Sequence, residues 1–235
     1  MKIRAVIFDL YGTLLEIGPP PADADRRWTQ AWKDGPGTAP RLDLAQFDAR
    51  CRQVVAAEHA AARARGIPYP EVYWPDVVDA VLPEFARLPA AQRTGASVYQ
   101  ADFMRAVRLM PGAANVLRAA QRAQLHLGLA SNCQPYTLGE LDDALAGAGL
   151  SRDLFDPRIS FLSFQQGFSK PDPHVFRLLT ARLRTLGIEP GEAVMVGDRA
   201  DNDIAPARAH GWQTCQIGPQ TDTDWERLVG WFSQP

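Results

Sequence analysis

The sequence is poor in cysteine and has no long apolar run. Its 235 residues include only three cysteines, Cys51, Cys133 and Cys215, whose wide spacing argues against a disulfide framework or a paired-cysteine zinc site. No apolar stretch approaches the ~20 residues that a membrane-spanning helix needs, and the first residues do not have the pattern of a signal peptide. A formal net charge of −2 argues against a general nucleic-acid coat. We therefore expect a cytoplasmic protein that binds neither nucleic acid nor membranes.

Lysine is also scarce, because only Lys2, Lys33 and Lys170 are lysines among 25 basic residues. Chemistry that depends on a lysine therefore has three candidates. Lys33 lies beside a glycine-rich segment, and a solvent-exposed loop is the simpler expectation for it.

Short apolar runs alternate with helix-like stretches over much of the chain. Nearly continuous apolar runs of this length are typical of strands that are buried on both faces. The alternation predicts an α/β fold with a doubly wound parallel sheet. The expected strands are Ile3–Phe8, Leu125–Ala130, Arg158–Leu162, Ala193–Val196 and Gln213–Ile217, and the expected helices are Ala113–Gln124, Tyr136–Ala148, His174–Leu186 and Asp203–Ala209.

One interval of the chain interrupts this alternation. Between Glu16 and Met110 the sequence is rich in Ala, Arg, Leu and Trp, and helices are expected over Asp43–Arg65, Pro75–Leu88 and Ser97–Leu109. We expect residues 16–110 to form a helical cap, and residues 1–15 and 111–235 to form the α/β core.

Polar residues follow several of the expected strands. Asp9 ends the first strand, Ser131 and Asn132 follow the second, and Asp198 follows the fourth, with Asp203 close behind. Lys170 lies in a Lys-Pro-Asp-Pro segment. Because ligands bind beyond the carboxyl ends of parallel strands, these groups are expected to meet there. Each residue alone has an ordinary explanation as a helix cap or a surface charge, but together they point to a catalytic site.

In this combination the sequence resembles the haloacid dehalogenase-like hydrolases. The first motif of that superfamily is matched by Asp9 with Gly12-Thr13, and the second by Ser131. Its third is matched by Lys170, and its fourth by Gly197-Asp198 with Asp203. The resemblance implies a Rossmann-like core with an inserted helical cap.

The resemblance also implies site roles. Asp9 would be the nucleophile, and Asp9, Asp198, Asp203 and the backbone carbonyl of Tyr11 would bind Mg²⁺, which suits an all-oxygen site. Lys170, Ser131 and Asn132 would contact the substrate. The expected function is a Mg²⁺-dependent phosphatase that acts on a small phosphorylated metabolite through an aspartyl-phosphate.

Tyr11 departs from the family's phosphatases, which usually carry a second aspartate two residues after the nucleophile. With an unperturbed pKa near ~10, tyrosine is a poor general base. The Asp-Leu-Tyr-Gly-Thr segment resembles the 2-haloacid dehalogenases, which work without metal but carry Ser-Ser-Asn where this chain has Val196-Gly197-Asp198. A metal-independent dehalogenase and a catalytically weak binding protein therefore stay open as alternatives.

The cap is expected to choose the substrate. Arg26, which follows the first motif closely, is the best candidate to meet a carboxylate or halide of the substrate, and Tyr11 is expected to line the same space. Most of the cap's aromatic residues are expected to form its core. The oligomeric state is left open, and a homodimer is compatible with the sequence.

Overall fold

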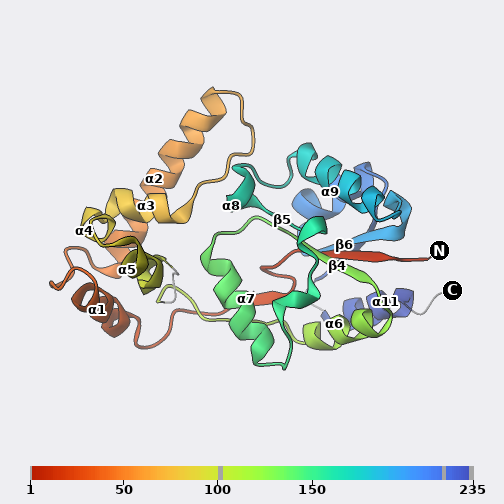
Figure 1. The fold of residues 1–235 in the computed structure, drawn as a ribbon, viewed down its shortest axis with the longest axis horizontal. Coiled ribbons are helices and arrows are strands. Elements are labelled where there is room, and N and C mark those ends of the chain that lie inside the picture. Colours follow the sequence, from red (N-terminus) through yellow and green to blue (C-terminus); the bar gives the residue numbers. More distant parts are fainter. Residues whose placement is uncertain (1, 100–102, 219–220, 233–235) are drawn as a thin grey trace.

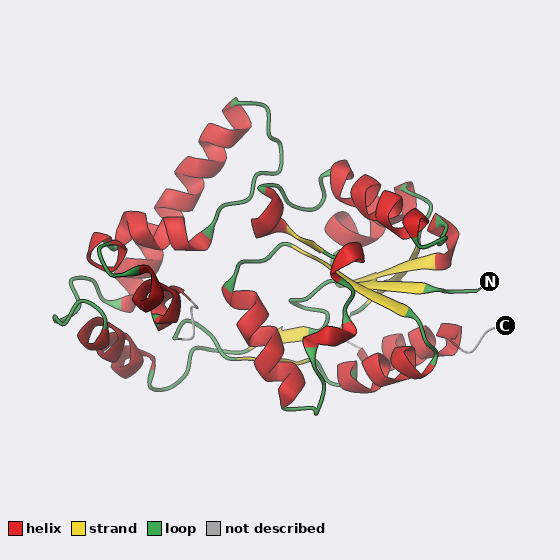
Figure 2. Ribbon diagram, viewed as in Figure 1, coloured by secondary structure: helices red, strands yellow, loops and turns green. Residues whose placement is uncertain are grey.

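A five-stranded parallel sheet forms the centre of the protein. The computed structural model describes residues 2–99, 103–218 and 221–232, and its main sheet has the order β5-β4-β1-β6-β7 (Figure 2). The strands are β1 (Ala5–Phe8), β4 (His126–Ser131), β5 (Phe161–Leu162), β6 (Ala193–Gly197) and β7 (Gln213–Gln216). A strand forms at each of the five expected places, and the predicted α/β fold is confirmed. Of the expected strand Arg158–Leu162, however, only Phe161–Leu162 is extended, because a 3-10 turn (Pro157–Ile159) precedes it.

Helices cover both faces of this sheet because its central strand is apolar on both sides. In β1, Val6 and Phe8 pack in one core cluster, whereas Ala5 and Ile7 pack in the other. The first cluster includes side chains of α6 (Ala113–Arg122), α7 (Tyr136–Ala146) and α11 (Thr221–Phe232). The second includes side chains of α9 (Pro173–Thr185) and α10 (Ala205–Ala209). The expected helix over Asp203–Ala209 is split between α10 and the preceding π-helical turn η5 (Ala200–Ile204).

The cap is a separate group of helices at one end of the molecule (Figure 1). It contains α1 (Ala24–Asp34), α2 (Leu44–Ala64), α3 (Trp74–Val81), α4 (Pro83–Ala86) and α5 (Ala90–Gly95). These helices enclose an aromatic core of their own, in which Trp28 contacts Trp32, Phe47 and Phe103 at centroid distances of 4.9–6.0 Å. The expectation that most of the cap aromatics are structural is confirmed for these residues.

Two cap predictions were wrong. The expected helix over Pro75–Leu88 is divided into α3 and α4, because Pro83 has no N–H to continue the helical hydrogen bonds. The expected helix over Ser97–Leu109 is replaced at its ends by a 3-10 turn (Ser97–Tyr99) and by strand β3 (Val107–Leu109), with residues 100–102 outside the described residues.

Strand β3 forms where it does because a partner strand is available. It pairs antiparallel with β2 (Leu15–Ile17), so that the chain leaves the core and returns to it through one two-stranded ribbon. The predicted cap boundaries at residues 16 and 110 lie at this ribbon and stay a prediction. Within the described residues, no helix is both long enough and apolar enough to cross a membrane.

Candidate active site

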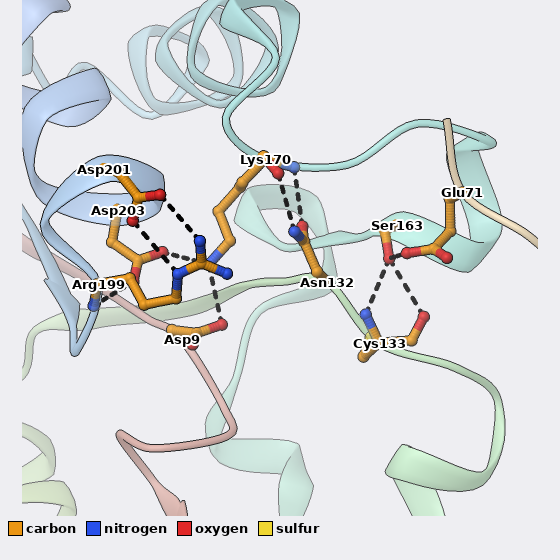
Figure 3. A network of polar contacts seen from close by, with 9 residues as sticks. All are labelled: Asp9, Glu71, Asn132, Cys133, Ser163, Lys170, Arg199, Asp201 and Asp203. Atoms are coloured by element: carbon orange, nitrogen blue, oxygen red, sulfur yellow. Dashed lines mark hydrogen bonds and ion pairs between the residues drawn. The ribbon is translucent and has the colours of Figure 1, made fainter. Parts of the chain in front are cut away.

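The candidate site lies where the parallel strands end. Asp9 directly follows β1, Ser131 is the last residue of β4, and Asp198 directly follows β6. Because β1 pairs with both β4 and β6 in parallel, these three ends lie next to one another. Lys170 comes from the loop before α9 (Figure 3). The predicted convergence of Asp9, Asp198, Asp203 and Lys170 is therefore present.

Lys170 is buried between two carboxylates. Its Nζ donates to Oδ1 of Asp9 at 2.9 Å and to Oδ1 of Asp203 at 2.5 Å, and its side chain is 0% exposed. Burial alone would lower the pKa of Lys170, but the charges of Asp9 and Asp203 outweigh it and raise the pKa. Lys170 is therefore an ammonium group, and its hydrogen bond orients the carboxylate of Asp9.

Three carboxylates approach one another closely enough to hold a metal ion. Ligand oxygens of Asp9, Asp198 and Asp203 all lie within 4.8 Å of one another. Both oxygens of Asp203 are already engaged, Oδ1 by Lys170 and Oδ2 by the backbone N–H of Arg199 at 3.1 Å. Of the three, Asp203 therefore has the least capacity left for a cation.

Asp198 supplies the observation that tests the fit to a cation. Its Oδ1 is buried and has no hydrogen-bond partner among the described residues. Burial, followed by the charge of Asp9, raises the pKa of Asp198. A buried acceptor without a partner costs free energy, and a bound cation removes that cost. The oxygen-only donor set beside Asp9 fits Mg²⁺.

Two buried hydroxyl groups are also unpaired among the described residues. They are Oγ of Ser131 and Oγ1 of Thr13, with residue exposures of 1% and 0%. Hydroxyl groups donate readily to phosphoryl oxygens. Ser131 was predicted as a substrate ligand, whereas Thr13 was noted only as part of the first motif.

The side chain of Asn132 bonds to the backbone of Lys170, a contact that was not predicted from the sequence, whereas the predicted contact to substrate involved the backbone of Asn132. Its Nδ2 donates to the carbonyl of Lys170 at 2.9 Å, and its Oδ1 accepts from the backbone N–H of Lys170 at 2.8 Å (Figure 3). These two bonds fix the backbone that carries the buried ammonium group. The side chain thus positions Lys170, and only the backbone of Asn132 stays a predicted contact to substrate.

Two glycines allow the acidic residues to come this close. A Cβ at Gly12, where φ is +81°, would lie 2.5 Å from Oδ2 of Asp198. A Cβ at Gly197 would lie 2.5 Å from the side chain of Asp203. Any larger residue at these positions would displace a predicted metal ligand.

Tyr11 turns its hydroxyl group toward α7 and the segment before β3. The hydroxyl contacts Oγ1 of Thr137 at 2.7 Å, the carboxylate of Glu140, and Nη2 of Arg105 at 2.5 Å. Burial raises the pKa of Tyr11 well above its usual value. The predicted weakness of Tyr11 as a base therefore agrees with its surroundings.

The partners of Tyr11 could not be singled out from the sequence. Arg105 donates to Glu140 through Nε at 2.9 Å and through Nη2 at 3.0 Å. The Arg105 guanidinium also lies over the rings of Tyr11 and Tyr136, at 4.6 and 5.0 Å from their centroids. Arginine is common in this chain, and nothing in the local sequence marks Arg105.

Arg26 is not brought to the site. It lies in the first turn of α1, where it pairs with Asp23, and its side chain is 79% exposed. Asp23 lies three positions before Arg26, a spacing at which side chains of a helix meet. Lys33, in the last turn of the same helix, is exposed as well.

A loop of the cap contacts the core next to the strand ends. Glu71 accepts from Oγ of Ser163 at 2.6 Å (Figure 3). It also accepts from Nε2 of Gln134 at 3.0 Å. Ser163 in turn accepts from the backbone N–H of Cys133 at 2.8 Å. The backbone N–H of Ser169 donates to the carbonyl of Tyr69 at 2.9 Å. This loop therefore connects the cap with the segments that carry Ser131 and Lys170.

Comparisons with known proteins agree with this arrangement. A model of the haloacid dehalogenase-like hydrolases matches residues 3–211, and the chain belongs to that hydrolase family. It is 31% identical to a phosphoglycolate phosphatase of Rhodospirillum rubrum over 88% of this chain and 76% of that protein. It is 37% identical to a phosphoserine phosphatase of Thermus thermophilus, but over only 44% of this chain and 38% of that protein's length.

Solved structures share the fold at lower identity. A HAD family enzyme of Bacteroides thetaiotaomicron has a TM-score of 0.58 at 17% identity and covers 97% of this chain and 98% of its own. A 2-haloacid dehalogenase of Pseudomonas syringae also has a TM-score of 0.58, at 21% identity, and covers 93% of this chain and 87% of its own. At these identities the likeness extends to the fold alone.

Proposed function

We propose that this hydrolase is a Mg²⁺-dependent phosphohydrolase that acts on a small phosphorylated metabolite through an aspartyl-phosphate. The observation that carries the proposal is the buried, unpaired Oδ1 of Asp198 beside the nucleophile candidate Asp9. A metal-independent dehalogenase has no use for an acidic group in this position. The two phosphatase relatives support the same reaction class.

Each residue of the site has a part in this reaction. Asp9 and Asp198 would hold the cation, with the Tyr11 carbonyl and Asp203 at its edge, and bound Mg²⁺ would offset the charge of the phosphoryl group. An oxygen of Asp9 attacks phosphorus, and the leaving oxygen departs with its bonding electrons. Lys170 orients Asp9 through its hydrogen bond, while Ser131 donates a hydrogen bond to the phosphoryl oxygens. Water then hydrolyses the aspartyl-phosphate and restores Asp9.

The proposal is tested by phosphate release from a generic aryl phosphate. We expect release with Mg²⁺, its loss with a chelator, and its recovery when Mg²⁺ is added back. Asp9→Asn should abolish turnover, because an amide is not a nucleophile, while the circular dichroism spectrum stays that of the native fold. Unchanged activity in Asp9→Asn would exclude the mechanism.

A dehalogenase is the second candidate, and Tyr11 is the residue that favours it. Displacement of halide from carbon by Asp9 needs no proton, so an unreactive Tyr11 would be no handicap. Metal-independent halide release from 2-chloropropionate would move the protein to that class. A burst of one equivalent of the phenol from an aryl phosphate, without turnover, would instead favour a catalytically weak binding protein.

A cytoplasmic location is part of the same proposal. All three cysteines are free and buried, as suits a reducing compartment.

A further inference from the structure

The hydroxyl group of Tyr11 has no proton left to donate to a substrate. A phenol has one proton to donate and two lone pairs to accept with. Its single proton is directed to acceptors of α7, the carboxylate of Glu140 and Oγ1 of Thr137 at 2.7 Å, and its oxygen accepts from Nη2 of Arg105 at 2.5 Å. The group two residues after Asp9 therefore offers no proton to a leaving group.

Neighbouring groups hold Tyr11 in this position from two sides. Arg105 and Glu140 form a two-bond ion pair whose side chains are only 19% and 9% exposed. The guanidinium also lies over the Tyr11 ring at 4.6 Å. Rotation of Tyr11 toward the substrate would leave Glu140 and Arg105 with unmet hydrogen bonds in a largely buried place, which is costly.

The other proton-bearing groups described around Asp9 are engaged in other tasks. Lys170 donates to Asp9 and Asp203, and Asp203 accepts through both of its oxygens. Asp198 is one of the predicted cation ligands and lies beside Asp9. Ser131 and Thr13 carry aliphatic hydroxyl groups, which donate hydrogen bonds but are too weakly acidic to protonate a leaving oxygen.

We propose that this enzyme hydrolyses phosphoryl donors whose leaving group departs as a stable anion, such as acyl, enol and aryl phosphates, and that simple alkyl phosphates react far more slowly. The inference rests on the proposed phosphohydrolase function and names its substrate class. As the bond from Asp9 to phosphorus forms, the bond to the leaving oxygen breaks and its electron pair leaves with that oxygen. A carboxylate, whose conjugate acid has a pKa near ~4, can leave with the electron pair without being protonated. An alkoxide, whose conjugate acid is about as weak as water (~16), cannot.

The second half of the reaction, hydrolysis of the aspartyl-phosphate, needs only water as a reactant. The oxygen of water bonds to phosphorus, the bond between phosphorus and Asp9 breaks, and the protons of water remain on the phosphate. Because no neighbouring base speeds this step, the phosphorylated form of Asp9 should accumulate during turnover.

The test compares leaving groups at constant Mg²⁺. Values of kcat/KM are measured for acetyl phosphate, for a series of aryl phosphates of graded leaving-group pKa, and for phosphoglycolate and phosphoserine. We expect a steep fall with rising leaving-group pKa, with acetyl phosphate exceeding the two alkyl phosphates by at least about 10²-fold, the contribution usual for a general acid. A flat profile would overturn the inference alone. Absence of phosphate release from every compound would overturn the proposed function and this inference together.

Two variants at position 11 sharpen the result. Tyr11→Asp introduces a carboxyl group that can protonate the leaving oxygen. It should raise kcat/KM for the alkyl phosphates more than for acetyl phosphate, and so flatten the dependence of kcat/KM on leaving-group pKa. Tyr11→Phe removes only the hydroxyl, and the profile should stay as steep as in the wild type. A steeper profile in Tyr11→Phe would mean that the hydroxyl does donate a proton, and would contradict the inference. The wild-type profile decides the question even where a variant folds poorly.

Discussion

At the scale of single residues, the site depends on how closely its acidic groups approach one another. Like charges at such distances repel, and three features of the chain hold them together. Lys170 supplies a buried positive charge, Asn132 fixes the Lys170 backbone, and Gly12 leaves room for Asp198. Among the described residues, Oδ1 of Asp198 has no hydrogen-bond partner, which is the observation that supports the proposed cation site.

Replacing Gly12 by alanine should therefore weaken metal binding. The new Cβ would lie 2.5 Å from Oδ2 of Asp198 and would push the carboxylate aside. We expect Mg²⁺ affinity, measured by titration calorimetry, to fall roughly 10–100-fold, as for other changes that displace a metal ligand's support.

Gly66→Ala is the matched control for this substitution. Gly66 has a similar φ of +88°, but a Cβ there meets nothing within 4 Å. Both variants should lose about 1–2 kcal/mol of unfolding free energy through the left-handed backbone. Only Gly12→Ala should lose Mg²⁺ affinity, and equal affinities in the two variants would contradict this account.

At the scale of secondary-structure elements, the ribbon of β2 and β3 brings a cap residue to the core. Arg105 lies two residues before β3, and the return of the chain at this point places its guanidinium against Glu140 of α7. The ion pair is largely buried and carries the hydrogen bonds of Tyr11. The conformation of Tyr11 is thus determined by where the chain re-enters the core.

Arg105→Met should be clearly destabilising, because it leaves Glu140 in a largely buried place without its ion-pair partner. We expect a loss of about 3 kcal/mol in the free energy of unfolding, measured with urea. Arg108→Met is the control, since Arg108 pairs with Glu16 on an exposed part of the same ribbon and its loss should have little effect. Equal effects of the two substitutions would exclude a structural role for the buried pair.

At the scale of the whole molecule, the cap contacts the core through a half-buried acid. Glu71 lies in the cap loop before α3, and its carboxylate meets Ser163 and Gln134 of the core. Burial, which outweighs these hydrogen bonds and the charge of His59, raises the pKa of Glu71 above its ordinary value of 4.5. The folded protein therefore binds this proton more tightly than the unfolded chain does.

This shift predicts a pH-dependent effect of Glu71→Gln. As pH rises through the window that begins near 4.5, the wild type loses stability because it has to ionise a half-buried group. Glutamine has no such cost, so the thermal midpoint of Glu71→Gln relative to the wild type should rise with pH. The prediction fails if that difference is independent of pH.

Glu84→Gln provides a control of opposite sign. The hydrogen bond from Arg41 outweighs burial and lowers the pKa of Glu84, so its stabilising contribution is present at neutral pH and is lost as pH falls. The thermal midpoint of Glu84→Gln relative to the wild type should therefore fall as pH rises.

Much of the core could be predicted from the sequence, because its strands are encoded by short, contiguous runs of apolar residues. Apolar strands are visible in a few residues, and the polar residues that follow them meet wherever parallel strands end together. The approach of Asp9, Asp198, Asp203 and Lys170 follows from that rule. The secondary structure of Ser97–Leu109 could not be predicted in this way. Its last residues form a strand only because they pair with Leu15–Ile17, which lies far away in the chain.

The contacts around Tyr11 could not be predicted for a similar reason. Arg105 and Glu140 are 35 positions apart, and their approach depends on how the ribbon returns beside α7. Arg26 illustrates the opposite error, since closeness to the first motif in sequence suggested a substrate contact, whereas Arg26 is exposed on α1 and pairs with Asp23.

The central claim is that Asp9 attacks a phosphoryl group in a metal-bound site. It is tested most directly by offering one preparation both acetyl phosphate and 2-chloropropionate, each with Mg²⁺ and with a chelator. We expect phosphate release that requires Mg²⁺, and no halide release under either condition. Halide release that persists in the chelator, without phosphate release in Mg²⁺, would contradict the account.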